Sequence, residues 1–273
     1  SFSVKAQDDT IKNIITEATE NSHLEILAHE LLDIVGPRLT GTPQMRNAHD
    51  WAVQRYADWG INARIHEWGE WNGWERGITH IDMISPRVRT LSGIQLGYSP
   101  STSLKGITGE LDVIPEVKNK DEFNAWLKTI KGKFILSSMY QITGRPDYNW
   151  EEYATPESFK KMKETRSEAT RKWNSNFRKM GINRRQISKT LEDAGAIGLL
   201  SSNWAGGFGA NRIFSTGTKT IPHLDLELED YSMLYRMVES GAGPEIRVVS
   251  TSKDLGIVPT FNTLAEIKGV EKP

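Results

Sequence analysis

The chain has 273 residues, a formal net charge of -1 and no cysteine. That length suffices for one large domain or two ordinary ones, each with a hydrophobic core of its own. The balanced charge argues against a polyanion-binding field over the whole molecule, and the lack of cysteine excludes disulfides, a thiolate nucleophile and Cys-ligated zinc. No run of about eighteen apolar residues occurs, so the sequence predicts no membrane span.

The first seven residues are mostly small or apolar, and they precede the acidic pair Asp8-Asp9. Such a segment is typical of the end of a secretory signal peptide. The alternative is a disordered N-terminus. We favour the first interpretation and expect an exported protein, periplasmic or secreted.

Three helices and a strand are predicted over residues 10–68. Apolar residues at helical spacing indicate two helices over residues 11–35, or one helix with a break at Asn21-Ser22. A third helix begins after Thr42, a good N-cap residue, and ends before Gly60. Its apolar face is formed by Met45, Ala48, Ala52, Tyr56 and Trp59. Residues 61–68 alternate as a strand does, so this part suits one edge of an α/β domain.

From Gly77 onwards, short apolar runs separated by Gly, Pro and Asp predict strands. They cover residues 77–84, 91–98, 109–114, 134–138, 197–201 and 224–228, and a helix follows through Met237. Their spacing predicts an independent β-rich domain over residues 77–252, with a helical insertion at about 156–190.

The insertion, residues 156–189, is rich in lysine and arginine. Basic residues interleaved with aromatic ones can follow a phosphate backbone and stack bases, which is the nucleic-acid interpretation. The simpler interpretation is a solvated helical excursion that Phe159, Trp173 and Phe177 anchor to the β-rich domain. We favour the simpler one and predict no nucleic-acid partner.

The segment His29-Glu30-Leu31-Leu32-Asp33 differs by one residue from a zinc-binding helix with two histidines one turn apart. Aspartate can replace a histidine as an oxygen ligand. However, at about 100° per residue His29 and Asp33 point away from the apolar stripe of this helix, so we expect them to face water.

Other candidate residues carry weaker signals. The six histidines share no ligand spacing, and each is expected at the surface or in a hydrogen bond; they are His23, His29, His49, His66, His80 and His223. The glycine-rich segment 206–209 lacks the Lys and helix start of a phosphate-binding loop, so it predicts a turn. Ser158 and Ser250 precede a lysine by three residues, a spacing expected by chance here.

Five tryptophans are dense near the proposed domain junction: Trp51, Trp59, Trp68, Trp71 and Trp74. Tryptophan clusters serve domain junctions, subunit interfaces and ligand clefts alike. We favour packing at the junction over a substrate pocket.

Two segments carry a family resemblance: Gly36-Pro37-Arg38-Leu39-Thr40-Gly41-Thr42-Pro43 and Thr260–Gly269. They resemble the co-catalytic zinc exopeptidases of the glutamate carboxypeptidase and plasma carboxypeptidase type. The segments 132–136, 194–200 and 221–231 resemble the protease-associated domain that is inserted in several such enzymes. The resemblance implies an α+β chain: a partial α/β peptidase edge, residues 1–76 and 253–273, around the inserted domain.

The resemblance also implies two zinc ions in the whole enzyme, sharing a bridging carboxylate and a water, with a glutamate as base. Family members place their ligands after the strand that corresponds to Thr260–Gly269, starting with a His-x-Asp pattern. That pattern does not occur in this chain. We therefore assign no catalytic, cofactor-binding or metal-ligating residue, and expect the 273-residue chain to be inactive and free of zinc.

The sequence thus predicts the N-terminal part of an exported zinc-dependent exopeptidase acting on small peptides, cut before its metal ligands. A homodimer is compatible with this prediction. The alternative is a non-enzymatic module that binds a protein or another polymer. A coding region continuing into His-x-Asp after Pro273 favours the enzyme, and a stop codon favours the module.

Overall fold

The computed structural model describes residues 2–209 and 211–269, with side chains from residue 9 onwards. The predicted signal-peptide remnant therefore lies partly outside the described residues; the backbone of its residues 2–7 belongs to helix α1. Among the described residues, no helix combines the length and apolarity needed to cross a bilayer.

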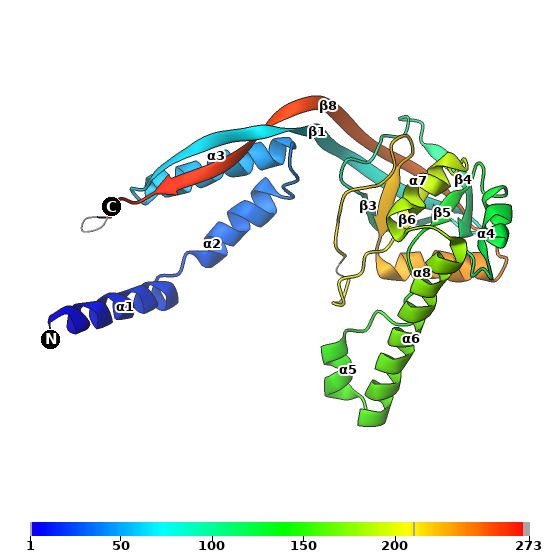
Figure 1. Ribbon diagram of the computed structural model, residues 1–273, viewed down its shortest axis with the longest axis horizontal. Coiled ribbons are helices and arrows are strands. Elements are labelled where there is room, and N and C mark those ends of the chain that lie inside the picture. The colour runs from blue at the N-terminus through cyan, green and yellow to red at the C-terminus, as the bar shows by residue number, and fades with distance from the viewer. Residues whose placement is uncertain (1, 210, 270–273) are drawn as a thin grey trace. The chain divides into compact units, whose positions relative to one another are not determined.

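The chain forms two compact units. Unit 1 comprises residues 1–74 and 254–273, and unit 2 comprises residues 75–253. The unit boundaries lie two residues before the predicted boundary at 76/77 and one residue after that at 252/253. Two long neighbouring strands connect the units (Figure 1). Strand β1 (Asn62–Ser85) crosses the first boundary, and strand β8 (Glu245–Glu266) crosses the second.

The length of these two strands corrects the prediction, which had separate strands at 61–68 and 77–84 and a new strand at Thr260. The glycines that suggested breaks are positions where β1 and β8 approach closely. A Cβ on Gly73 would lie 2.7 Å from a methyl group of Val258, and one on Gly77 would lie 2.1 Å from the Thr251 hydroxyl. Glycine inside a strand allows such an approach and need not end the strand.

Unit 1 also contains helices α1 (Phe2–Glu20), α2 (Leu24–Ala28) and α3 (Pro43–Asp58), with a π-helical segment η1 (His29–Val35). The predicted break at residues 21–22 is confirmed. The cap of α3 is confirmed as well: Met45 N donates to Thr42 Oγ1 over 3.2 Å, and Pro43 occupies the first turn.

Unit 2 is built on a mixed sheet. Its shorter strands are β2 (Arg89–Thr90), β3 (Gly93–Gln95), β4 (Ile107–Val113), β5 (Phe134–Leu136), β6 (Gly198–Ser201) and β7 (His223–Leu226). The strand order is β2-β1-β8-β4-β5-β6-β7-β3. Strands β4 to β7 are parallel, whereas β8 and β3 pair antiparallel to β4 and β7.

Helices cover both faces of this sheet. The helices of unit 2 are α4 (Lys120–Leu127), α5 (Asp147–Tyr153), α6 (Pro156–Met180), the short 3-10 helix η2 (Arg184–Gln186), α7 (Ile187–Asp193) and α8 (Leu228–Glu239). Of these, α8 packs on one face of the sheet, and α4, α6 and α7 pack on the other. One apolar cluster joins Phe134, Leu136 and Leu200 to α8. The other joins Ile135 and Leu199 to α4, α6 and α7. Because β5 and β6 are buried on both faces, β5 is apolar at every position and β6 is polar only at its last residue, Ser201, as is typical of parallel central strands.

The unit therefore holds more helix than the β-rich domain that the sequence predicted. Short parallel strands need crossover connections, and these are helical here. The insertion is a hairpin of α5 and α6, which lie side by side in Figure 1. Trp173 and Phe177 pack into the second cluster as expected, but Phe159 does not; its ring lies 5.1 Å from Lys163 Nζ.

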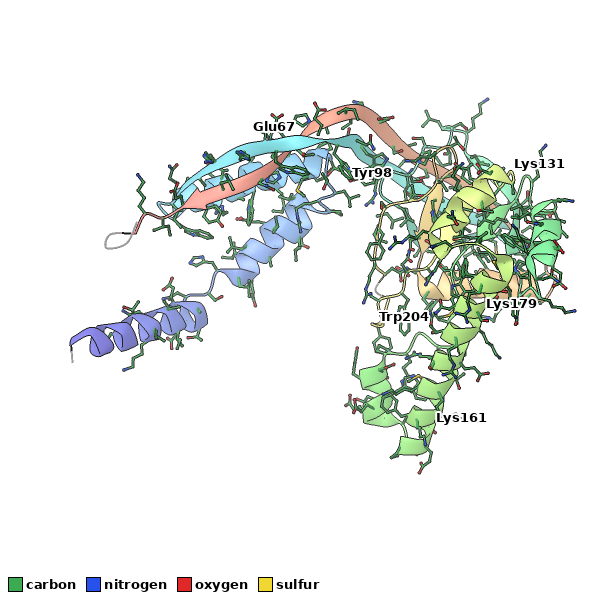
Figure 2. The ribbon with its side chains drawn as sticks, in the orientation of Figure 1. Glu67, Tyr98, Lys131, Lys161, Lys179 and Trp204 are labelled. Atoms are coloured by element: carbon green, nitrogen blue, oxygen red, sulfur yellow. The ribbon has the colours of Figure 1, made fainter. Side chains whose placement is uncertain are left out.

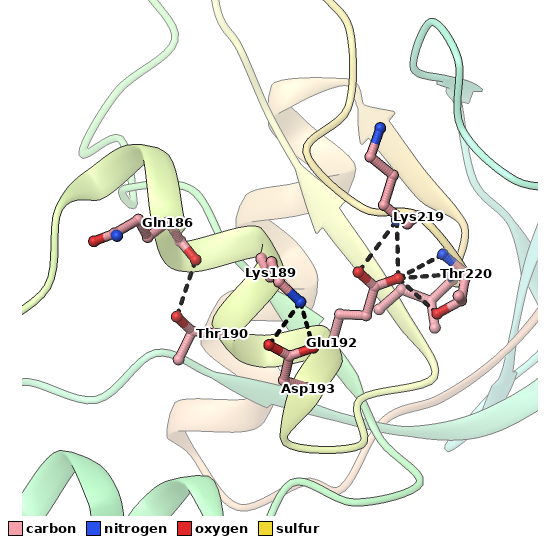
Figure 3. A network of polar contacts seen from close by, with 8 residues as sticks. Gln186, Lys189, Thr190, Glu192, Asp193, Lys219 and Thr220 are labelled. Carbon is pink, nitrogen blue, oxygen red and sulfur yellow. Dashed lines mark hydrogen bonds and ion pairs between the residues drawn. The ribbon is translucent and has the colours of Figure 1, made fainter.

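Two polar residues tie segments of unit 2 together. His223 is buried at the start of β7, where its Nδ1 lies 3.0 Å from Thr216 Oγ1 and its Nε2 has no partner. Glu192, on α7, accepts hydrogen bonds from the backbone N–H groups of Lys219, Thr220 and Ile221 and from the Thr220 hydroxyl (Figure 3).

We predict that His223 makes the fold sensitive to acid. Burial lowers the pKa of His223 to about 4, whereas an unfolded histidine titrates near 6.5. Between these values the unfolded chain binds a proton that the folded chain excludes, so stability is full above about pH 6.5 and falls as the pH drops to 4. The loss is on the order of 3 kcal/mol.

Urea unfolding of the wild type and of His223→Gln at pH 7.5 and pH 4.5 measures this difference. The variant should lose less free energy of unfolding between the two pH values than the wild type. His80→Gln, at an exposed position of the same unit, is the control and should behave as the wild type. An equal loss in all three proteins would contradict the prediction.

We predict that Glu192→Gln destabilises unit 2 by about 1 kcal/mol, because hydrogen bonds to a charged group contribute more than neutral ones. Burial would raise the pKa of Glu192, but the hydrogen bonds from Thr220, Lys219 and Ile221 outweigh it and lower the pKa. Its carboxylate thus stabilises the fold above the unfolded pKa. The adjacent Asp193→Asn removes only an exposed pair with Lys189, so a thermal melt should show a clearly smaller change.

Candidate functional site

The two segments that carry the family resemblance meet in unit 1. Thr40–Pro43, at the start of α3, and Leu255–Asn262, in β8, line one cavity of about 460 Å³. Its remaining walls are formed by Met45, Arg46, His49 and Trp68. A backbone hydrogen bond from Trp74 N to Gly41 O, 3.2 Å long, also holds this segment to β1, and a Cβ on Gly41 would lie 3.4 Å from a methyl group of Val258 in β8.

His49 is the titratable side chain at the centre of this cavity wall. Its Nδ1 lies 2.9 Å from Thr263 Oγ1 in β8, and its Nε2 is buried without a hydrogen-bond partner. Burial and then the neighbouring positive charge of Arg46 lower the pKa of His49, while Asp50 raises it less. The imidazole is therefore neutral at pH 7 and presents one unused ring nitrogen.

Arg46 and Thr260 complete the polar part of the cavity. The Arg46 guanidinium lies 4.7 Å from the centroid of the Phe261 ring, and its Nε donates to Asp50 over 3.3 Å. The Thr260 side chain is 3 % exposed, and its hydroxyl has no partner. The cavity can hold an apolar group and offer it a few polar contacts, but its lining includes no carboxylate and a single histidine.

Metal chemistry needs more ligands than this cavity holds. Within residues 2–209 and 211–269, no three His, Cys, Asp or Glu side chains come together as a metal site. His29 and Asp33 form an exposed pair, with 2.8 Å between Nδ1 and Oδ2 and side chains 63 % and 69 % exposed. They face water, as the helical wheel predicted.

The other sequence candidates are dispersed. His23, His66 and His80 are exposed, and His223 is buried in unit 2. Gly207 O accepts a hydrogen bond from Trp204 Nε1 in a turn. Ser158 lies in the first turn of α6, where its N–H donates to the capping Thr155 hydroxyl and its own hydroxyl oxygen accepts from it. Among the five tryptophans only Trp74 is buried, while Trp59, Trp68 and Trp71 are each about half exposed. Packing of these tryptophans at the junction of the two units stays a prediction.

His49 was the functional candidate that sequence reasoning passed over. It was grouped with the surface histidines because it has no ligand spacing. Because His49 follows Met45 by four residues, it lies on the same side of α3 as the apolar residues. This helical spacing is the sequence feature that could have indicated a position in the interior.

No family model matches the chain. Curated relatives do: the chain is 24% identical to carboxypeptidase Q of Pongo abelii over 274 residues, which are 99% of the chain and 51% of that protein. It is 25% identical to carboxypeptidase Q of Homo sapiens over 269 residues, 97% of the chain and 50% of that protein. The chain thus spans about half the length of these relatives.

Solved structures share the fold. A peptidase M28 precursor from Shewanella amazonensis matches with a TM-score of 0.61 at 18% identity, over 97% of this chain and 55% of that one. A zinc aminopeptidase from Bacillus subtilis matches with a TM-score of 0.50 at 15% identity, over 89% and 46%. The sequence relatives are peptidases, and the shared fold is that of peptidase structures.

We predict opposite effects for two threonines of this cavity. Thr42→Val should destabilise unit 1 by about 1 kcal/mol, because it removes the cap of α3. Thr260→Val should be neutral or stabilising, because the Thr260 hydroxyl is buried without a partner and a methyl group has the same shape. Thermal unfolding of both variants tests this, and a large loss in Thr260→Val would show that its hydroxyl is bonded.

Proposed function

We propose that this chain is the N-terminal half of an exported zinc-dependent exopeptidase that hydrolyses small peptides. The observation that carries the proposal is the match to carboxypeptidase Q over nearly the whole chain but only half of the relative. The structural likeness to a peptidase M28 precursor supports it.

In this proposal the metal site belongs to the other half. The described residues bring together no metal-binding group, and one structural neighbour is named as a zinc aminopeptidase. We propose two zinc ions, held by residues after the strand β8, with a His-x-Asp pattern first among them. Unit 1 is then the edge of the peptidase domain, and unit 2 is an inserted protease-associated domain.

Exposed apolar side chains of unit 1 support a missing partner surface. At least half of the side chain is exposed for many of them: Ile14, Ile15, Leu24, Ile26, Leu32, Ile34, Trp59, Trp68, Ile257 and Ile267. Large exposed apolar surfaces are rare on monomeric soluble proteins and mark interfaces. The second half of a peptidase domain would cover such a surface without any change in this chain.

The proposal predicts that the 273-residue chain, after dialysis, contains no stoichiometric zinc and hydrolyses no dipeptide or aminoacyl chromogenic substrate. A longer polypeptide read from the same gene should bind about two zinc ions and hydrolyse small peptides, losing activity on chelation. Metal analysis and a chromogenic assay on both polypeptides give the answer.

Two outcomes would overturn the proposal. Zinc-dependent turnover by the 273-residue chain would show that the metal ligands lie within it. A stop codon directly after Pro273 would favour the non-enzymatic binding module.

A further inference from the structure

One cavity of unit 2 lies at an edge of its parallel sheet and has a volume of about 850 Å³. Its walls come from the segments that follow β5, β6 and β7: residues 140–149, residues 204–209 and the first turns of α8. Because β5, β6 and β7 are parallel, these three segments leave the sheet at the same edge. Its volume lies in the range of small-molecule sites.

Hydrogen bonds inside the protein hold these walls in place. Ser138, after β5, is bonded through its N–H and its carbonyl to the buried Tyr231 hydroxyl of α8, at 2.8 and 2.7 Å. The buried Asp225 carboxylate in β7 accepts from the backbone N–H of Asn203 at 3.0 Å and from Asn211 Nδ2 at 2.6 Å. The site is thus largely formed before any ligand binds.

The segment after β5 has a second anchor. Arg166 of α6 donates to the carbonyl oxygens of Thr143 and Arg145, at 3.0 and 2.6 Å. Its guanidinium also lies 4.9 Å from the Trp204 ring, a residue labelled in Figure 2. One partly buried arginine therefore contacts wall residues of two different segments.

Three arginines line the cavity, and their partners differ. Arg89 pairs with Asp230 over 2.6 Å. Arg145 and Arg236 have no carboxylate within 4.0 Å among the described residues. Arg145 donates from Nε to Asn149 Oδ1 and lies beside the Trp150 and Tyr153 rings, so only its terminal NH groups are without an acceptor in the described part of the chain. Arg236 reaches the Tyr140 hydroxyl at 3.5 Å. Two guanidinium groups are thus available for an incoming anion.

The rest of the lining selects the kind of anion. Ile142, Trp204 and Met233 supply apolar surface, and Glu227 and Glu229 supply negative charge at the start of α8. A polyanion would be repelled by these two glutamates. A ligand with one carboxylate, an apolar side chain and one ammonium group satisfies all three parts of the lining.

We propose that this cavity binds a short peptide by its free carboxyl terminus. The carboxylate binds to Arg145 and Arg236, the C-terminal apolar side chain lies against Trp204 and Met233, and the ammonium group faces Glu227 and Glu229. Bidentate pairing makes arginine well suited to carboxylates. The site involves residues of unit 2 alone and does not depend on the proposed zinc site.

Calorimetric titration of the 273-residue chain with Ala-Leu-Phe, in the presence of EDTA, tests the proposal. The free acid should bind, and its C-terminal amide should bind about tenfold more weakly, as expected from losing one charge-assisted contact. Arg236→Gln, at an exposed position of α8, should weaken binding of the acid about tenfold. Arg171→Gln, exposed on α6 and outside the cavity, is the matched control and should bind as the wild type.

The same titrations can overturn the proposal. Absence of binding by the free acid, equal binding of acid and amide, or an Arg236→Gln variant that binds as the wild type would each do so, provided that circular dichroism shows folded protein. Inorganic phosphate that competes as well as the peptide would identify a simple anion site instead. Because EDTA removes any zinc, peptide binding here is distinguishable from binding at a peptidase active site.

Discussion

The burial of strands β5 and β6 on both faces is the constraint on which unit 2 depends. Phe134, Leu136 and Leu200 face one cluster, and Ile135 and Leu199 face the other. Three or four consecutive apolar residues can be covered only by helices on both sides of the sheet. Their close packing also explains Gly198, where a Cβ would lie 2.5 Å from the Phe134 ring. The parallel arrangement then brings the connecting segments to common edges, where a cavity can form.

Buried carboxylates control the segments at these edges. Burial raises the pKa of Asp225, while hydrogen bonds from Ser201, Asn203 and Asn211 act in the opposite direction. A buried acid with this many donors is costly to leave unpaired, so the loop after β6 is held to β7. Glu192 serves a similar purpose for residues 219–221 at a more exposed place.

Unit 1 has a smaller buried core than unit 2. Its helices bury little apolar area, and of α3 only Ala48 is fully buried. The contacts that do hold it, such as Thr42 with Met45 and His49 with Thr263, are local or polar. The whole chain, not unit 1 alone, spans about half the length of its carboxypeptidase Q relatives. The proposed function therefore assigns the catalytic metal to a different part of the protein.

The sequence by itself determined the features that depend on neighbouring residues. Capping and spacing located α3, the break at residues 21–22 and the strands β4 to β7 within a few residues, and the resemblance of two segments named a peptidase family. The tertiary structure decided what depends on distant residues. It showed that β1 and β8 are continuous, because Gly73 and Gly77 of β1 allow β8 to approach closely, and that Phe159 lies outside the core. It also placed His49 beside Thr263, 214 positions away in the sequence, and placed Arg145 and Arg236 in the wall of one cavity. No local sequence pattern predicts either arrangement.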